Sequence, residues 1–511
     1  MTETLATLIE THAEDLPAFG APDRDWLSYG GLRGLASNVA ASLHSMGVGR
    51  GDRVAIVLPN GPEMAAAFIT IAQVATTAPL NPAYREEEYD FYLSDLKAKA
   101  LVVMEGYDGP ALAAARKADM AVIRLSVPEG APAGAFELSS DREDRADESA
   151  PGPEDIALIL HTSGTTSRPK IVPLLQTNVA ASAMHIRTSL DLTQEDRCMN
   201  VMPLFHIHGL IAAVAASLAA GGSVWCAPGF DALKFFGWMK DSKPTWYTAV
   251  PTMHQAILSR AGRNAETIAE TPLRFLRSSS ASLPASVMRR LEETFGAPVI
   301  EGYGMTEAAH QMASNPLGKG RQRPGAVGLE AGPKVRIAHE TEDRITGGTG
   351  EIVISGPNVT PGYEGNPDAN EKSFFSAEGA RWFRTGDQGA FDEEGYLRLT
   401  GRLKEIINRG GEKISPLEVD DVLLDHPDVA QVVTFALPHP KLGEDVAAAV
   451  VLSEGSEATE KDIRAFAAER IADFKVPRRI IIMDEIPKGA TGKMQRIGLA
   501  EKLGLVDAAQ S

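Results

Sequence analysis

Runs of apolar residues alternate with amphipathic segments through the first two thirds of the chain. Residues 52–58 and 100–104 are short aliphatic runs that predict buried strands, and residues 62–75 predict a helix between them. Strands that alternate with helices in this way form parallel sheets covered by helices. Beyond residue 325 short strands separated by glycine predict a small β-rich module, whose last strand is predicted at residues 396–400. We therefore expect an α/β fold with stacked α/β subdomains plus this module.

The length of 511 residues exceeds what one hydrophobic core usually supports, so at least two domains are expected. After residue 401 a short charged link leads into a compact α+β stretch that runs to the end of the chain. Residues 127–155 are rich in proline, glycine, alanine and acidic residues, and they predict a surface loop without a catalytic role.

The composition is that of an intracellular protein. Only two cysteines occur, and both Cys198 and Cys226 lie in apolar runs that predict buried, inert thiols. The N-terminus lacks the order of a signal peptide, and the apolar stretches 65–72 and 210–220 are too short to span a bilayer. We expect a cytoplasmic protein, a monomer or homodimer, without a membrane partner. The net charge of −18 argues against nucleic acid as a partner.

Candidate chemistry begins with the segment LHTSGTTSRPK at residues 160–170. It follows a predicted strand at residues 156–160 and is rich in hydroxyls and glycine, with Lys170 at its end. Such a segment can surround an anion with backbone N–H groups and hydroxyls. Its spacing is not that of the Walker loop. The sequence predicts a phosphate-binding loop here, with an ordinary surface turn as the alternative.

Five segments together resemble the adenylate-forming superfamily, which includes the acyl-CoA synthetases, and the resemblance covers essentially the whole chain. In order along the chain they are LHTSGTTSRPK (160–170), EGYGMTE (301–307), WFRTGD (382–387), GRLKEIINRGGEKISP (401–416) and PKGATGKMQR (487–496). The chain departs from the family pattern at Ser167 and Ile171, where glycines are usual, and at Asn408, where several relatives carry lysine. The stiff, β-branched Ile171 is the less expected departure in a phosphate-binding loop.

The resemblance implies three parts: an N-terminal adenylate-forming domain at residues 1–401, a hinge at 402–404 and a mobile C-terminal domain at 405–511. Lys404 occupies the family's hinge position. In the family the small domain swings between one pose for adenylation and another for thioester formation, and a few residues suffice to absorb such a rotation.

The same resemblance implies ATP and CoA as co-substrates and Mg²⁺ as the metal ion. It assigns nucleotide binding to Thr162, Ser163, Gly164, Thr165, Thr166, Lys170, Tyr303, Thr306, Asp387 and Arg402. Glu307 is the expected Mg²⁺ ligand. Lys493 matches the catalytic lysine of the first step, and Thr306, Glu307 and His206 are the other expected catalytic residues. Asp387 offers two acceptor oxygens to the ribose hydroxyls, and Tyr303 a flat face to adenine.

In the second step CoA attacks the acyl-adenylate. The strand and turn of Arg409, Gly410 and Gly411 resemble the lining of the pantetheine tunnel. Because ATP and CoA are polyanions and the chain is acidic, a local basic field has to attract them. The C-terminal part supplies the candidates Arg402, Lys404, Arg409, Lys413, Lys475, Arg478, Arg479, Lys488 and Lys493.

Polar residues fill the three segments that line the acid pocket in the family, at residues 203–210, 278–283 and 303–312. Histidines and hydroxyls there favour a short acid with a second carboxylate. These segments most resemble the oxalate–CoA ligases, and we expect His206, Ser280 and His310 to bind oxalate. A zinc site at His206 and His208 lacks a third ligand at a familiar spacing.

Other readings remain open at this point. The substrate could be malonate or another short acid, His206 could be a gate residue general to the superfamily, and His310 could be structural. The chain could also load a carrier protein or only bind nucleotide, although Lys493, Glu307 and Asp387 favour an active enzyme.

Overall fold

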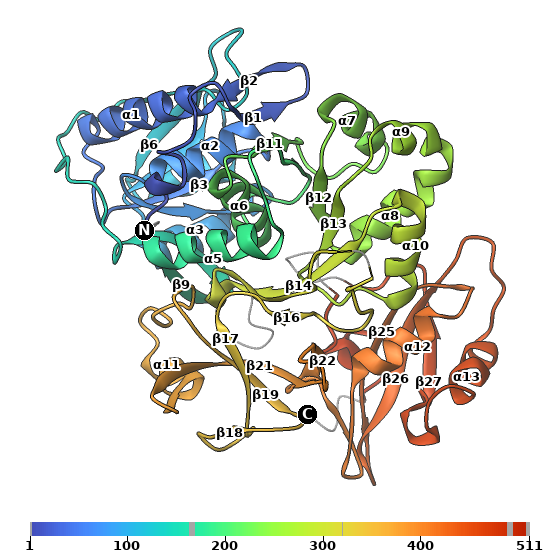
Figure 1. Cartoon of the computed structure of the whole chain (residues 1–511). Helices are drawn as coiled ribbons and strands as arrows, with labels where there is room; N and C mark the ends of the chain where they lie inside the picture. Colours follow the sequence, from blue (N-terminus) through green and yellow to red (C-terminus); the bar gives the residue numbers. More distant parts are fainter. Residues whose placement is uncertain (1–2, 163–168, 319, 488–493, 507–511) are drawn as a thin grey trace.

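The computed structural model describes residues 3–162, 169–318, 320–487 and 494–506. These residues form four sheets, two wide ones in the first two thirds of the chain and two smaller ones after it (Figure 1). The expected α/β architecture with a β-rich module and a smaller α+β C-terminal part is confirmed.

The first wide sheet has the strand order β7-β6-β5-β3-β4-β8-β9, in which β6, β5, β3, β4 and β8 are parallel. Its strands are β3 (Arg53–Val57), β4 (Thr76–Pro79), β5 (Ala100–Met104), β6 (Ala121–Ser126), β7 (Glu137–Ser140), β8 (Ile156–Thr162) and β9 (Lys170–Leu175), and its helices are α1 (Tyr29–Ser45), α2 (Pro62–Ile71), α3 (Glu86–Leu96) and α4 (Pro110–Lys117). The prediction of a loop over residues 127–155 was wrong at β7. This edge strand pairs with β6 through its backbone, and Leu138 packs against the core.

The second wide sheet has the order β16-β15-β14-β13-β12-β10-β11-β1-β2. Its strands are β1 (Pro17–Ala21), β2 (Arg24–Ser28), β10 (Arg197–Asn200), β11 (Ser223–Cys226), β12 (Trp246–Ala249), β13 (Phe275–Ser278), β14 (Val299–Met305), β15 (His310–Ser314) and β16 (Leu329–Glu330). With it go α5 (Gln176–Ser189), a π-helix (His208–Ala215), α6 (Ala216–Ala219), α7 (Phe235–Ser242), α8 (Pro251–Ala261), α9 (Ala265–Glu270) and α10 (Ala285–Phe295). Because β12, β13 and β14 are parallel, the residues that follow them meet at one edge.

The core confirms two expectations. Cys198 and Cys226 are fully buried free thiols, and burial raises the pKa of each above its ordinary value, so both are inert. The apolar stretches 65–72 and 210–220 are buried helical segments. Within the described ranges, none of the helices has the length and apolar character that crossing a bilayer requires.

Two smaller sheets complete the chain. The first contains β17 (Lys334–Ala338), β18 (Ile345–Thr346), β19 (Gly350–Ser355), β20 (Phe374–Ala377), β21 (Ala380–Phe391) and β22 (Leu397–Arg402), with α11 (Pro367–Ser373) beside it. The second contains β23 (Ile407–Arg409), β24 (Glu412–Ile414), β25 (Val429–His439), β26 (Gly443–Leu452) and β27 (Arg479–Ile482), with α12 (Pro416–Leu424), α13 (Glu460–Ala468) and α14 (Leu499–Lys502). The chain passes from one sheet to the other between Arg402 and Ile407. The limits 1–401, 402–404 and 405–511 stay a prediction.

Candidate active site

Tyr303 and Arg402, which come from two other predicted segments, both contact Asp387. The hydroxyl of Tyr303, on β14, donates to Asp387 Oδ2 at 2.6 Å, and Arg402 Nε, at the end of β22, lies 3.1 Å from Asp387 Oδ1. Tyr303 and Asp387 are buried, whereas the Arg402 side chain is 58% exposed. The carboxylate is therefore oriented from one side by a buried phenol and from the other by an accessible cation.

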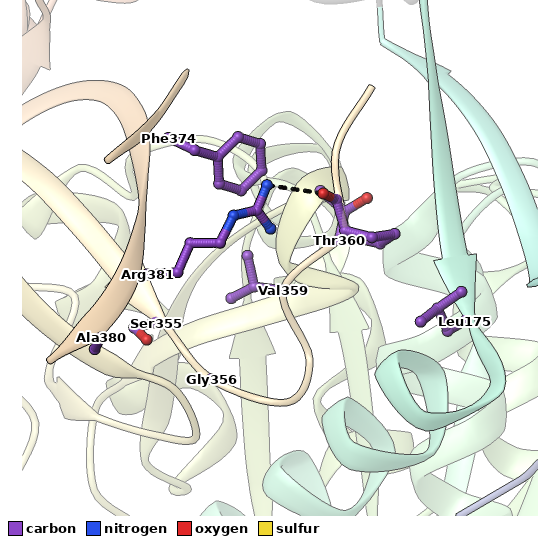
Figure 2. Close-up of a pocket in the computed structure, with 9 residues that line it drawn as sticks. Leu175, Ser355, Gly356, Val359, Thr360, Phe374, Ala380 and Arg381 are labelled. Carbon is purple, nitrogen blue, oxygen red and sulfur yellow. Dashed lines mark hydrogen bonds between the residues drawn. The ribbon is translucent and has the colours of Figure 1, made fainter. Parts of the chain in front are cut away.

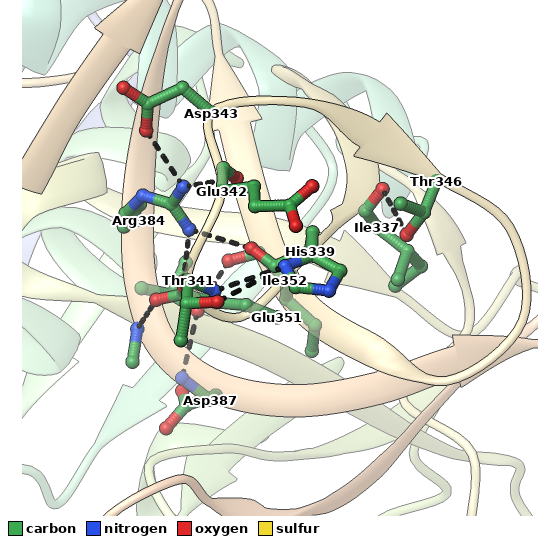
Figure 3. A network of polar contacts seen from close by, with 12 residues as sticks. Ile337, His339, Thr341, Glu342, Asp343, Thr346, Glu351, Ile352, Arg384 and Asp387 are labelled. Carbon is green, nitrogen blue, oxygen red and sulfur yellow. Dashed lines mark hydrogen bonds and ion pairs between the residues drawn. The ribbon is translucent and has the colours of Figure 1, made fainter.

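The backbone of Asp387 is held by a neighbouring polar network (Figure 3). Arg384 Nη1 lies 2.6 Å from Glu351 Oε2, and Glu351 Oε1 accepts the N–H of Gly386 at 3.0 Å. The hydroxyl of Thr385 accepts the N–H of Asp387 at 3.1 Å. Two consecutive N–H groups are thus fixed by side chains, which limits the freedom of the Asp387 carboxylate.

Glu307 lies in a short 3₁₀ turn (Thr306–Ala308) directly after β14 and is only 6% exposed. Its Oε1 accepts the hydroxyl of Tyr363 at 2.8 Å, and Lys170 Nζ lies 4.2 Å from the centre of the Tyr363 ring. Burial raises the pKa of Glu307 above its usual value, while Lys170 and Arg402 oppose this shift. Burial likewise lowers the pKa of Lys170, against the attraction of Glu307.

A single buried carboxylate suits Mg²⁺. This ion keeps several waters and takes one or two protein carboxylates together with phosphate oxygens. Glu307 offers one oxygen to Tyr363 and keeps further acceptor capacity, and Thr306 adjoins it. Over the described ranges no group of three or more His, Cys, Asp or Glu side chains could hold a metal. The residues present fit a magnesium ion shared with a nucleotide better than a metal cage built from protein ligands alone.

The predicted phosphate-binding loop begins and ends on a β-hairpin. Thr162 is the last residue of β8 and pairs with Lys170, the first residue of β9. Ser163, Gly164, Thr165 and Thr166 lie outside the described residues, as does Lys493. Ile171 is a strand residue that pairs with His161 and packs in the core, so the chain's departure from glycine has a physical reason.

Two of the three predicted oxalate ligands, Ser280 and His310, lie beside His208, which belongs to the predicted pocket segment 203–210 but was not predicted to bind oxalate. His208 opens the π-helix and is 1% exposed, with Nδ1 3.0 Å from Ser280 Oγ and Nε2 2.6 Å from Thr248 Oγ1. The ring of His310 lies 5.2 Å from that of His208. Ser280 and His310 have φ angles of 73° and 100°, so both are held in strained backbone conformations, as is common at functional sites.

Arg277 is the second residue that the sequence reading missed. It lies on β13 and is fully buried, with Nη1 3.4 Å from His208 Nε2 and Nη2 donating to Gln311 Oε1 at 3.3 Å. The signal in the sequence was an arginine inside an otherwise apolar strand, next to the serine-rich run 278–282. His206 lies just before the π-helix, partly buried against Phe205 at 4.6 Å between ring centres, and its role stays a prediction.

The predicted CoA-tunnel residues form the tip of a hairpin. Gly410 and Gly411 connect β23 to β24 with φ angles of 61° and 98°, the left-handed values that a two-residue hairpin turn requires. Arg409 Nε lies 2.7 Å from the buried Asp445 Oδ1. Lys404 is exposed in the link between the two small sheets. The structure thus places the glycines and Lys404 at the surface and anchors Arg409.

Several of the expected basic residues are already paired. Lys413 Nζ lies 2.7 Å from Glu340 Oε2, and Lys475 Nζ lies 2.6 Å from Glu418 Oε1. Neighbouring carboxylates offset the charge of these two lysines in this structure, and the expected local basic field stays a prediction. Lys488 and Lys493 lie outside the described residues.

A separate pocket lies beside Thr360 and Arg381 (Figure 2). It is lined by Leu175, Ser355, Gly356, Val359, Thr360, Pro361, Phe374, Ala380 and Arg381. The N–H of Thr360 donates to the Glu307 carbonyl at 2.8 Å, so the pocket wall supports the turn from behind. None of the predicted site residues lines this pocket, and we do not assign it to the active site.

Glu301, at the start of the EGYGMTE segment, yields a prediction on stability. It is 3% exposed, its Oε1 accepts the N–H of Leu283 at 2.9 Å, and burial raises its pKa to about 8. Because the folded-state pKa is raised, the fold favours the neutral carboxyl of Glu301. The free energy of unfolding is therefore highest below pH 4.5 and falls as the pH rises through 8. In the wild type Glu301 should lower the free energy of unfolding by up to about 1.4 kcal/mol per pH unit between these values, and in Glu301→Gln this decrease should be absent.

Urea unfolding at pH 5.5, 7 and 8.5 measures this difference. Glu292→Gln is the matched control, because Glu292 also accepts a backbone N–H, from Val299 at 3.2 Å, but is less buried. Equal slopes of stability against pH in the wild type and Glu301→Gln would contradict the prediction.

Comparison with known proteins identifies the family of the chain. The model of the AMP-binding enzyme family matches residues 8–364, and the model of the AMP-binding enzyme C-terminal domain matches residues 418–493. Oxalate–CoA ligase of Arabidopsis thaliana is 46% identical over 507 residues, covering 97% of this chain and 98% of the relative. Oxalate–CoA ligase of Saccharomyces cerevisiae is 40% identical over 477 residues, covering 88% and 87%.

A solved structure has the same fold over its whole length. ATP-bound MatB from Rhodopseudomonas palustris superimposes with a TM-score of 0.86 at 30% identity, covering 98% of this chain and 99% of that one. The fold of this solved structure therefore matches that of the chain over nearly all of its length. The chain belongs to the family of AMP-binding enzymes.

Proposed function

We propose that this enzyme is an ATP-dependent oxalate–CoA ligase, which converts oxalate, ATP and CoA into oxalyl-CoA, AMP and pyrophosphate. The observation that carries the proposal is the polar wall of the acid pocket. His208 and Arg277 are buried and Ser280 is half-buried, and His208 contacts both of the other two, where an enzyme for fatty or aromatic acids would need small apolar residues. The two oxalate–CoA ligases that share 40–46% identity support the same acid.

In the first step an oxygen of the acid attacks the α-phosphorus of ATP, and pyrophosphate leaves. Both reactants are anionic, so the protein's contribution is positioning and neutralisation of charge. In the proposal residues 162–166 and Lys170 hold the β- and γ-phosphates, Thr306 contacts the α-phosphate, and Lys493 bridges the attacking carboxylate and the nucleotide. A magnesium ion at Glu307 would neutralise phosphate charge. Asp387, Arg402 and Tyr303 would hold the nucleoside.

In the second step the thiol of CoA attacks the carbonyl carbon of the oxalyl-adenylate, and AMP leaves with the bonding electrons. We propose that the small domain turns about Lys404 between the steps and brings Arg409, Gly410 and Gly411 to the pantetheine arm. Such a turn would break the Lys413–Glu340 ion pair that joins the two parts in this structure. A surface ion pair of this kind costs little to break.

The test is CoA-dependent pyrophosphate release with ATP and Mg²⁺ across oxalate, malonate, acetate, a medium-chain fatty acid and a cinnamate. We expect kcat/KM for oxalate to exceed that for every other acid at least tenfold. Preference for malonate or acetate would overturn oxalate but leave acid–CoA ligation standing. Pyrophosphate release that proceeds without CoA and needs a carrier protein would overturn CoA ligation itself.

A further inference from the structure

Arg277 is a buried cation whose partners are neutral. Its side chain is fully buried on β13, and its two polar contacts lead to His208 and Gln311. Its Nε has no hydrogen-bond partner, and neither of its contacts among the described residues is with a carboxylate. Burial lowers the pKa of Arg277 to about 10, so the guanidinium stays charged at neutral pH. A protein keeps such a costly charge only where something gains from it.

The sequence makes room for this charge. Gly302 lies on the neighbouring strand β14, and a Cβ atom at Gly302 would lie 2.8 Å from Arg277 Nη2. Any larger residue at position 302 would push the guanidinium out of place. Gly302 therefore serves close approach and not a special backbone angle, because its φ is not positive.

The contacts of Arg277 determine how His208 carries its proton. His208 Nε2 lies 3.4 Å from Arg277 Nη1 and 2.6 Å from the hydroxyl oxygen of Thr248. The Thr248 hydroxyl can donate or accept, whereas the guanidinium can only donate, so the contact with Arg277 makes Nε2 an acceptor. A neutral imidazole that accepts at Nε2 carries its proton on Nδ1, which lies 3.0 Å from Ser280 Oγ. Ser280 Oγ then accepts from His208. The hydroxyl proton of Ser280 is left to be donated elsewhere.

We propose that Arg277 is a positioning residue for acid selection, which fixes the tautomer of His208 so that Ser280 donates its hydroxyl proton to the far carboxylate of a dicarboxylate substrate. The inference rests on the proposed function for the identity of the acid. The relay runs from Arg277 through His208 to Ser280, and it aligns three dipoles with the buried positive charge behind them. This field stabilises the second carboxylate of a bound dicarboxylate, whereas it does not stabilise the methyl group of a bound acetate.

The kinetic test replaces Arg277 with methionine, which has similar length and no charge. We expect Arg277→Met to lower the oxalate-to-acetate ratio of kcat/KM by about 100-fold, with the KM for ATP within threefold of wild type. The melting temperature should not fall, because an apolar side chain replaces an unpaired buried charge. Arg277→Lys keeps the charge with a single donor and should recover part of the ratio.

Nitrogen chemical shifts of histidine give a readout that folding alone would not move. In ¹⁵N-histidine-labelled enzyme, with the His208 signals assigned by their loss in His208→Gln, the wild type should carry its proton on Nδ1. Arg277→Met should move protonation toward Nε2. A wild-type proton on Nε2, or an unchanged oxalate-to-acetate ratio in a folded Arg277→Met, would overturn the proposal. If another acid is preferred by the wild type, the proposed function fails, and the nitrogen shifts still decide whether Arg277 sets the His208 tautomer.

Discussion

Glu307→Gln is expected to lower the rate of oxalate-dependent adenylation roughly 100- to 1,000-fold with little change in the fold. The carboxylate is buried, and burial raises its pKa, so the site holds a charge that gains from a cationic ligand. A magnesium ion shared with the phosphates is that ligand in the proposal. Glutamine keeps the shape and the hydrogen bond to the Tyr363 hydroxyl but removes the negative charge. Pyrophosphate release measured against Mg²⁺ concentration should show a weakened magnesium dependence.

The direction of the Glu307 pKa shift adds a pH dependence. Because the folded-state pKa is raised, the carboxylate needed for magnesium is lost earlier than for an ordinary glutamate as the pH falls. The magnesium concentration for half-maximal activity should rise toward acid pH in the wild type and stay flat in Glu307→Gln. Tyr363→Phe is the matched control, because it removes the hydroxyl that contacts Glu307 at 2.8 Å and keeps the charge. A Glu307→Gln enzyme with wild-type magnesium dependence would exclude Glu307 as the metal ligand.

The elements that the sequence predicts well are those in which local pattern and tertiary packing agree. Residues 52–58 and 100–104 are aliphatic runs, and they form β3 and β5 in the middle of a parallel sheet. The helix predicted over residues 62–75 ends at Ile71, because residues 76–79 pair as β4. Periodicity identifies an element more reliably than its boundary, since the end depends on which partner the chain meets next.

Ile171 is a second residue whose place could not be predicted without knowing its partner strand. Ile171 looked out of place in a phosphate-binding loop. It lies instead one residue inside β9, where a β-branched side chain packs against the sheet. The conflict disappears once strand pairing is known, but pairing between β8 and β9 is a tertiary fact that a motif does not carry.

The candidate site was predictable in part. The segments that carry Tyr303, Asp387 and Arg402 were expected to act on one nucleotide, and the structure brings these three side chains into contact. Arg277 was missed and the central place of His208 was not predicted, because both depend on a contact between β13 and a π-helix across 69 positions of sequence. Burial decides such cases, and a sequence alone does not tell which charge in an apolar strand will lose its water.

Asp387→Asn is expected to raise the KM for ATP about 100-fold. In the proposal both carboxylate oxygens accept ribose hydroxyls, and charge-assisted hydrogen bonds of this kind contribute about 1.5–3 kcal/mol each. Asparagine keeps the volume but offers one acceptor oxygen and no charge to Arg402, which lies 3.1 Å from Oδ1. Tyr303→Phe is the matched control, since it removes only the hydroxyl that donates to Oδ2 at 2.6 Å and keeps the ring. Its effect should stay below about tenfold.

A nucleotide without ribose hydroxyls separates this role from a general loosening of the site. The wild type should use ATP about 100-fold better than 2′,3′-dideoxy-ATP, whereas Asp387→Asn should barely distinguish the two, because the partner of the hydroxyls is already gone. Tyr303→Phe should keep most of the discrimination. If Asp387→Asn weakens both nucleotides equally and still discriminates between them, the carboxylate acts through the Tyr303–Arg402 arrangement and does not contact the ribose.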